Sequence, residues 1–209
     1  MDLFIARHAE SLENIGQNRS SDPDLSAVGV MQAQALGERM AEEELTAVFA
    51  SPALRAIRTA AAVLHRQNNR QLKLEILPEL AEYAFPPDFA MQSEDVLQTI
   101  CPICTPVRPY VYSAETPTDV YARAQKALDI IRMRCNSEDA CVFVASHGCF
   151  NNYLLQAAAG LPLQAHFNFS EQNACLSLIR YLSGNGHKHV KLRYINSVAH
   201  LPPDCVTGR

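Results

Sequence analysis

Short apolar runs alternate with longer stretches of helical periodicity along most of the chain. The runs of strand length cover residues 3–6, 47–50, 74–77, 141–145, 174–182 and 189–195. Helical spacing marks residues 26–43, the segments that follow residues 51 and 116, and residues 150–159. Such alternation is typical of α/β proteins, in which helices connect parallel strands. The pattern therefore predicts a three-layer α/β sandwich, with a mostly parallel central sheet and helices on both faces.

Two of the predicted helices carry start signals. Ser51-Pro52 and Thr116-Pro117 each place a hydroxyl side chain that can cap a helix before a proline, whose missing N–H costs nothing there. After Pro117 the apolar positions fall on one helical face, at Val120, Ala124, Ala127, Leu128 and Ile131. We expect helices to start at these two signals, and the second helix to cover the sheet.

Prolines interrupt the periodicity between residues 83 and 117. Long irregular segments in compact domains usually serve a function, so we interpret this one as a lid-like insertion within a single domain of residues 1–209. Residues 183–186, Ser-Gly-Asn-Gly, predict a hairpin turn between the last two strands. The sheet edge at that hairpin is available to pair with a second copy as a homodimer.

The composition excludes several kinds of partner. The chain has 209 residues, a formal net charge of -4 and 48% hydrophobic residues, and its sequence pI is about 6.0. A chain with this charge has no global basic field for nucleic acid or anionic membranes. The first residues, MDLFIARH, have neither a basic start nor a long apolar run. We therefore expect a cytoplasmic protein with neither a nucleic-acid nor a membrane partner.

Three of the strand-like runs end close to residues that suit a phosphate group. Residues 3–6 lead into Arg7-His8, residues 47–50 lead towards Arg55, and residues 141–145 lead into His147. If these strands are parallel, their carboxyl ends share the edge at which open α/β sheets place ligands. The helix carrying Arg55 would also direct its N-terminus there.

Two arginines and two histidines around one point form a cage for a dianion, because guanidinium groups bind phosphate oxygens in bidentate fashion. A neutral imidazole can attack phosphorus, and an imidazolium can donate to a nonbridging oxygen. The leaving alkoxide needs an acid, for which we favour Glu82 over Glu79 in the same loop. We also favour Arg55 over Arg58, which lies one turn further from the helix start and is expected to be solvated or to bridge to a carboxylate.

Residues 7–14, RHAESLEN, resemble the R-H-G-[EQ]-[ST]-x-x-N signature of the histidine phosphatase, or phosphoglycerate mutase-like, superfamily. Further segments resemble the family's later motifs in the family's order, at residues 24–33, 51–60, 80–82 and 146–148. The resemblance therefore covers nearly the whole chain outside residues 83–117.

This resemblance implies a phosphoglycerate mutase-like fold and a role for each matched residue. His8 would be the nucleophile, Arg7 and Arg55 would clamp the phosphoryl group, and His147 would stabilise it. Glu82 would protonate the leaving group. The implied substrate-binding positions are Ser11, Asn14 and Gly148. The resemblance also implies that the protein uses no metal ion and no other cofactor.

The expected activity is hydrolysis of a phosphate monoester, on a small phosphorylated substrate or a phosphoprotein, through a phosphohistidine intermediate. One alternative is a phosphoglycerate mutase, although the mutases carry a longer, arginine-bearing insertion after the acidic residue. The other is a non-catalytic phosphate-binding or interaction module. Ala9 is the reason for considering this second alternative, because it replaces the family glycine and would be strained at positive φ. Specificity is expected to come from residues 19–24 and 83–117, with Arg19 and Arg108 as candidate readers of further negative charge.

Cys101-Pro102-Ile103-Cys104 has the C-x-x-C spacing of zinc and dithiol sites. The chain has no second close cysteine pair for a structural zinc. The surrounding prolines do not suggest the helix that a redox pair normally opens. We therefore interpret these cysteines as a structural or incidental pair within the lid-like insertion.

Overall fold

The computed structural model describes residues 1–17, 20–86, 88–163, 169–184 and 187–208. Six strands form one sheet in the order β3-β2-β4-β1-β5-β6. They are β1 (Asp2–Arg7), β2 (Ala47–Ala50), β3 (Leu74–Ile76), β4 (Cys141–Ser146), β5 (Leu176–Gly184) and β6 (His187–Ser197). Strands β1 to β4 pair in parallel, whereas β5 pairs antiparallel with both β1 and β6. The mostly parallel sheet predicted from the apolar runs is confirmed.

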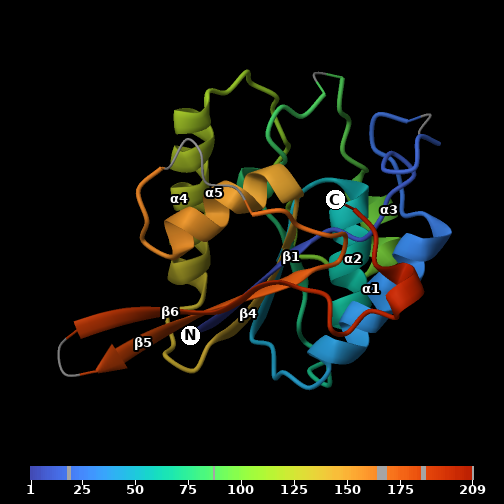
Figure 1. The fold of residues 1–209 in the computed structure, drawn as a ribbon. Helices are drawn as coiled ribbons and strands as arrows, with labels where there is room; N and C mark the ends of the chain where they lie inside the picture. The colour runs from blue at the N-terminus through green and yellow to red at the C-terminus, as the bar shows by residue number, and fades with distance from the viewer. Residues whose placement is uncertain (18–19, 87, 164–168, 185–186, 209) are drawn as a thin grey trace.

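Helices cover both faces of this sheet (Figure 1). They are α1 (Ala27–Met40), α2 (Leu54–His65), α3 (Glu94–Ile100), α4 (Pro117–Arg134) and α5 (Gly148–Ala158). Two short 3-10 helices are η1 (Pro78–Leu80) and η2 (Pro203–Cys205). Strand side chains alternate between two cores: Phe4 packs with α1 and α2, whereas Leu3 and Ile5 pack with α4 and α5. The three-layer sandwich is therefore confirmed.

Capping residues begin α1 and α4 as local chemistry requires. The Ser26 hydroxyl accepts a hydrogen bond from the Gly29 N–H at 3.0 Å. Thr116 and Asp119 form a reciprocal capping box at the start of α4, as the Thr116 signal predicted. Gly29 itself must be a glycine, because a Cβ there would lie 1.9 Å from the backbone oxygen of Glu10. This contact fixes α1 against the chain that follows β1.

The predicted cap at Ser51 is wrong. Helix α2 begins at Leu54, and its N-cap residue, Ala53, makes no side-chain capping bond. The cap comes instead from a distant loop, because Asp22 Oδ1 accepts the Leu54 N–H at 2.8 Å. Ser51 therefore does not cap α2, and its hydroxyl instead contacts His147. The other predicted boundaries differ from the observed ones by a few residues.

The C-x-x-C segment lies along the free edge of β3. Leu74 N–H donates to the Pro102 carbonyl, and Cys104 N–H donates to the Leu74 carbonyl, each at 2.9 Å. Cys101 is buried and Cys104 is exposed, and burial raises the pKa of Cys101 to about 11. The segment therefore covers a strand edge that would otherwise present unpaired backbone groups.

The β5–β6 hairpin extends past the rest of the sheet (Figure 1). Strand β6 is the edge strand, and it pairs with β5 as far as Gly184 and His187. Residues 185 and 186 of the predicted hairpin turn lie outside the described residues. Within the described parts of the chain, no helix combines the length and apolarity needed to cross a bilayer.

Candidate active site

Three parallel strands bring the predicted site residues to one edge of the sheet. Arg7 at the end of β1 is in register with Ser146 at the end of β4. The His8 N–H donates to the Ser146 carbonyl at 2.8 Å. Next to β4 on the other side, the Ser51 N–H donates to the Ala145 carbonyl at 3.0 Å. This register places the residues that follow β1, β2 and β4 side by side.

The His8 ring is held in one tautomer. Its Nδ1 lies 2.8 Å from the Ala9 carbonyl oxygen, and because a carbonyl can only accept, Nδ1 carries the proton. Nε2 therefore has the free electron pair, and it accepts a hydrogen bond from Arg55 Nε at 3.2 Å. Burial, together with the charges of Arg55 and Arg7, holds the pKa of His8 well below its usual value. The imidazole is neutral and its Nε2 can act as a nucleophile.

His147 faces His8, with the ring centroids 5.1 Å apart. Arg55 Nη2 lies 3.5 Å from His147 Nδ1, and since a guanidinium only donates, Nδ1 accepts. The Nε2–H then donates to the Ser51 hydroxyl at 2.6 Å. Burial and the Arg55 charge lower the pKa of His147 well below its usual value. His147 is thus neutral here, and the imidazolium expected from the sequence needs a nearby anion to form.

The structure distinguishes the two candidate arginines on α2. Arg55 is buried, hydrogen-bonds both histidines and lies 3.7 Å from a Glu13 oxygen. Arg58 is directed away and forms an ion pair with Asp24 at 3.1 Å, as expected for a residue bridging to a carboxylate. Of the two guanidinium groups, only that of Arg55 contacts the paired histidines.

Arg7 and Gly148 fit closely together. A Cβ at position 148 would lie 3.3 Å from Arg7 Nε, so glycine gives the arginine room to lie against the start of α5. Arg7 Nη1 donates to the Glu171 carbonyl. Arg7 Nε is buried without a hydrogen-bond partner among the described residues. A buried donor without a partner is costly, and a hydrogen bond to an entering oxyanion would remove that cost.

Ser11 and Asn14 contact each other. Asn14 Oδ1 accepts from the Ser11 N–H at 3.0 Å and from the Ser11 hydroxyl at 3.1 Å. It also accepts from Asn173 Nδ2 at 3.2 Å, and the same Nδ2 lies 3.3 Å from the His8 carbonyl oxygen. These side chains support the backbone of His8 in the structure, and a direct contact of Ser11 or Asn14 with a substrate stays a prediction.

The two candidate acids have different surroundings. Glu82 Oε1 accepts from the Tyr83 and Phe150 N–H groups, both at 2.8 Å, which places the carboxyl at the start of α5. Burial raises its pKa against the opposing effect of these hydrogen bonds. Glu79 is buried too, but hydrogen bonds from Arg108 and Lys126 outweigh this burial and lower its pKa. Glu82 is therefore the carboxyl that more readily keeps a proton.

Arg108, one of the two candidate readers of further charge, is used within the fold. Its Nη1 and Nη2 donate to the two Glu79 carboxylate oxygens at 3.0 and 2.7 Å. The guanidinium of Arg108 is therefore already bound to η1 through this bidentate pair. Arg19, the other candidate, lies outside the described residues.

Sequence reasoning missed several neighbours of the site. Phe85 is buried, with its ring centroid 5.7 Å from that of His147 and 5.8 Å from Arg55 Cζ. Thr59 Oγ1 accepts the Ala9 N–H at 3.0 Å. Ser51 and Asn173 complete the group. Thr59 lies in a matched motif and could have been found, whereas Phe85 and Asn173 lie in irregular segments with no periodic signal.

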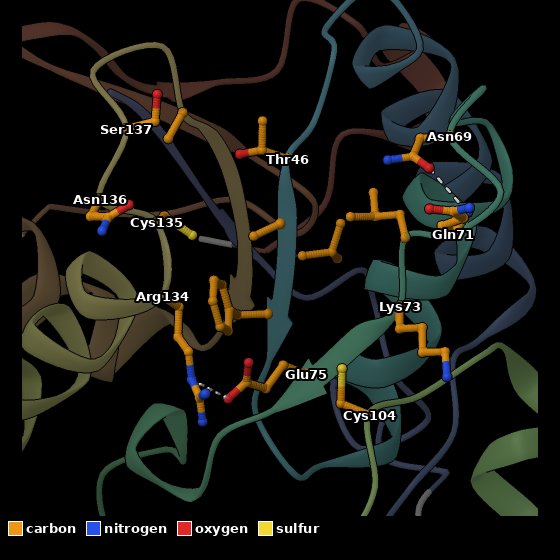
Figure 2. Close-up of a pocket in the computed structure, with 15 residues that line it drawn as sticks. Thr46, Asn69, Gln71, Lys73, Glu75, Cys104, Arg134, Cys135, Asn136 and Ser137 are labelled. Atoms are coloured by element: carbon orange, nitrogen blue, oxygen red, sulfur yellow. Dashed lines mark hydrogen bonds and ion pairs between the residues drawn. The ribbon is translucent and has the colours of Figure 1, made fainter.

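A cavity with different chemistry lies at the other ends of the strands, away from the paired histidines. It measures about 500 Å³ and is lined by residues before β2, β3 and β4, including Thr46, Lys73 and Ser137 (Figure 2). None of the described residues that line it is a histidine, and its Arg134 pairs with Glu75 at 3.5 Å. No group of three or more potential metal ligands occurs within the described residues. The paired histidines thus remain the centre of the candidate site.

The family model of the histidine phosphatase superfamily, branch 1, matches residues 3–193. The chain belongs to this superfamily. The match runs from Leu3 in β1 to Arg193 in β6 and includes every residue of the candidate site. It confirms the family expected from the motifs at residues 7–14 and 146–148.

Two curated relatives of this histidine phosphatase are the mouse and human forms of ubiquitin-associated and SH3 domain-containing protein A. The mouse protein is 35% identical over 85 residues, covering 39% of this chain and 14% of the relative. The human protein is 25% identical over 164 residues, covering 72% of this chain and 25% of the relative. This chain therefore spans a quarter or less of the length of these relatives.

Solved structures share its fold. The ecdysone phosphate phosphatase from Bombix mori, in complex with tungstate, has a TM-score of 0.71 at 21% identity and covers 94% of this chain and 95% of its own. A mycobacterial glucosyl-3-phosphoglycerate phosphatase, in complex with VO3, has a TM-score of 0.67 at 20% identity, and the match covers 94% of this chain and 99% of the phosphatase. At these identities the likeness shows a common architecture.

Proposed function

We propose that this histidine phosphatase hydrolyses a phosphate monoester through a phosphohistidine intermediate on His8. The observation that carries the proposal is the His8 tautomer: Nδ1 donates to the Ala9 carbonyl and leaves Nε2 as a neutral nucleophile beside Arg55. A protonated imidazole has no electron pair for phosphorus, so the lowered pKa of His8 favours the reactive form over a wide pH range.

In the first step, His8 Nε2 attacks phosphorus and a P–N bond forms as the P–O bond to the leaving group breaks. Arg7 and Arg55 donate to the equatorial oxygens, where charge accumulates. His147 joins them as an imidazolium, because the bound phosphate dianion raises its pKa and it takes up a proton. Glu82, whose raised pKa favours the protonated form, gives its proton to the leaving alkoxide. The products are the free alcohol, the phosphohistidine and the Glu82 carboxylate.

In the second step, water attacks the phosphorus of the phosphohistidine. The Glu82 carboxylate accepts a proton from this water as the P–N bond breaks. His8 regains its electron pair and inorganic phosphate leaves. Glu82 ends protonated, so that the site returns to its starting state.

The comparisons support a phosphatase, because the two solved structures described above are phosphatases in complex with oxyanions. Under the proposal the partner is a small phosphorylated substrate or a phosphoprotein. Metal independence, a cytoplasmic location and a homodimer stay predictions. Phosphoglycerate mutase-type transfer and phosphate binding without turnover are the alternatives that the experiment distinguishes.

The test is hydrolysis of 4-nitrophenyl phosphate, followed by acid and base treatment of the quenched protein. We expect turnover, and phosphate on the protein that is labile in acid but stable in base, both lost in His8→Ala. His65→Ala is the matched control, because His65 is an exposed histidine at the end of α2. Turnover by His8→Ala would refute the proposal. Transfer to an added alcohol without phosphate release would indicate a mutase, and binding without turnover an interaction module.

A further inference from the structure

Arg123 on α4 forms a bidentate ion pair with Glu115, which lies just before the helix. Its Nε and Nη2 each donate to a different Glu115 carboxylate oxygen at 2.7 Å. Both side chains are only 15% exposed. Arg123 lies between the apolar positions Val120 and Ala124, yet its guanidinium is directed inwards and not to solvent. This geometry fixes the plane of the guanidinium group.

The remaining donors of Arg123 hold the loop that carries Glu82. Nη1 donates to the carbonyls of Glu79 at 3.0 Å and Ala81 at 2.7 Å. Nη2 lies 3.4 Å from the Glu82 carbonyl oxygen. A single guanidinium therefore contacts three carbonyls, that of Glu79 within η1 and those of Ala81 and Glu82 just after it.

The same guanidinium also touches the other support of the Glu82 carboxyl. Its Cζ lies 4.5 Å from the centroid of the Phe150 ring. The Phe150 N–H is one of the two donors that hold Glu82 Oε1 at 2.8 Å. Arg123 thus joins the backbone that carries the acid to the helix start that orients its carboxyl.

We propose that Arg123, oriented by Glu115, is a positioning residue that sets Glu82 for proton transfer to the leaving group. The inference rests on the proposed function, in which Glu82 is the acid. Proton transfer needs hydrogen-bond contact, and a displacement of about 1 Å can cost on the order of 100-fold in rate. An ion pair kept only for stability would not need to hold three carbonyls of this loop.

The test compares substrates with different leaving groups. A 4-nitrophenolate leaves readily without an acid, whereas an alkoxide from an alkyl phosphate needs one. We expect Arg123→Met to lower kcat/KM for the alkyl phosphate by at least about 10-fold more than kcat/KM for 4-nitrophenyl phosphate. The comparison uses kcat/KM because this constant reports phosphoryl transfer to His8 and not the later hydrolysis, which both substrates share. Glu115→Gln, a milder change, should shift the ratio in the same direction. Arg132→Met is the matched control, because Arg132 lies on α4 with its guanidinium over Tyr181.

A double variant separates positioning from general loss of structure. If Arg123 acts through Glu82, adding Arg123→Met to Glu82→Gln should lower kcat/KM for the alkyl phosphate no further than Glu82→Gln alone. Equal losses for both substrates, or additive losses in the double variant, would overturn the inference. If Arg123→Met does not fold, Glu115→Gln in the same cycle decides the question. Should Glu82→Gln alone show no leaving-group preference, the proposed role of Glu82 would fail instead.

Discussion

Arg55 Nε lies 3.2 Å from His8 Nε2, the nitrogen that must attack phosphorus in the proposed reaction. The same guanidinium reaches His147 Nδ1 at 3.5 Å. A phosphate entering between the histidines would give Arg55 stronger, charge-assisted acceptors in place of two neutral ring nitrogens. Arg55 would thereby release the nucleophile at the moment that the phosphate is bound. Arg55 would therefore control when His8 Nε2 is free to react, in addition to supplying positive charge.

Arg55→Lys should consequently lower kcat/KM strongly. Lysine keeps the charge but not the planar fork, and a lost charge-assisted hydrogen bond costs about 1.5–3 kcal/mol, or on the order of 10- to 100-fold. Steady-state kinetics with 4-nitrophenyl phosphate measures the effect. Arg58→Lys is the control one turn away, and its exposed pair with Asp24 predicts a change of less than about twofold. Comparable losses in the two variants would argue against the role assigned to Arg55.

The core of the candidate site was predictable from the sequence because its residues follow apolar strands. His8 and His147 come directly after β1 and β4, and the ends of parallel strands meet at one edge. Phe85 and Asn173 were not predictable, since they reach the site from irregular segments placed only by tertiary packing. Ser51 shows the same limit: it has the signature of a helix cap, but Asp22 from another loop takes that role.

Ala9, which stands in place of the family glycine, should be fully compatible with activity. Its backbone is not among the positions with positive φ, and its methyl group is completely buried. Ala9→Gly should therefore leave kcat within about twofold while lowering the free energy of unfolding by about 1 kcal/mol, through lost burial and greater freedom of the unfolded chain. Urea unfolding and kinetics on the same preparation measure both. A tenfold gain in kcat would instead reveal strain at this position.

Chelation should leave turnover unchanged. In the proposed mechanism Arg7, Arg55 and His147 meet the charge on the phosphoryl oxygens, which is the task that a divalent ion performs in metal-dependent phosphatases. Dialysis against a chelator is expected to change kcat/KM by less than about twofold. A loss of activity that Mg²⁺, Mn²⁺ or Zn²⁺ restores would contradict this expectation.

Glu171 should make the stability of the protein depend on pH. Its side chain is buried, and Asn151 Nδ2 donates to Oε2 at 2.9 Å. Burial raises the pKa of Glu171 from 4.5 to about 7, an effect that the nearby Arg7 charge reduces but does not cancel. The folded protein therefore keeps a proton that the unfolded chain has already released between these two pKa values.

Because the folded state binds the extra proton, its stability falls as pH rises from about 4.5 to about 7. At 1.36 kcal/mol for each unit of pKa, the full loss is about 3 kcal/mol. Glu171→Gln keeps the shape without the charge, so its free energy of unfolding relative to the wild type should increase by about this amount between about pH 5 and about pH 8. Urea unfolding across that range measures it. Glu44→Gln, at an exposed position, is the control, and its free energy of unfolding should differ from that of the wild type by the same amount at every pH. A difference for Glu171→Gln that is equally independent of pH would show that Glu171 is ionised in the folded protein throughout this range.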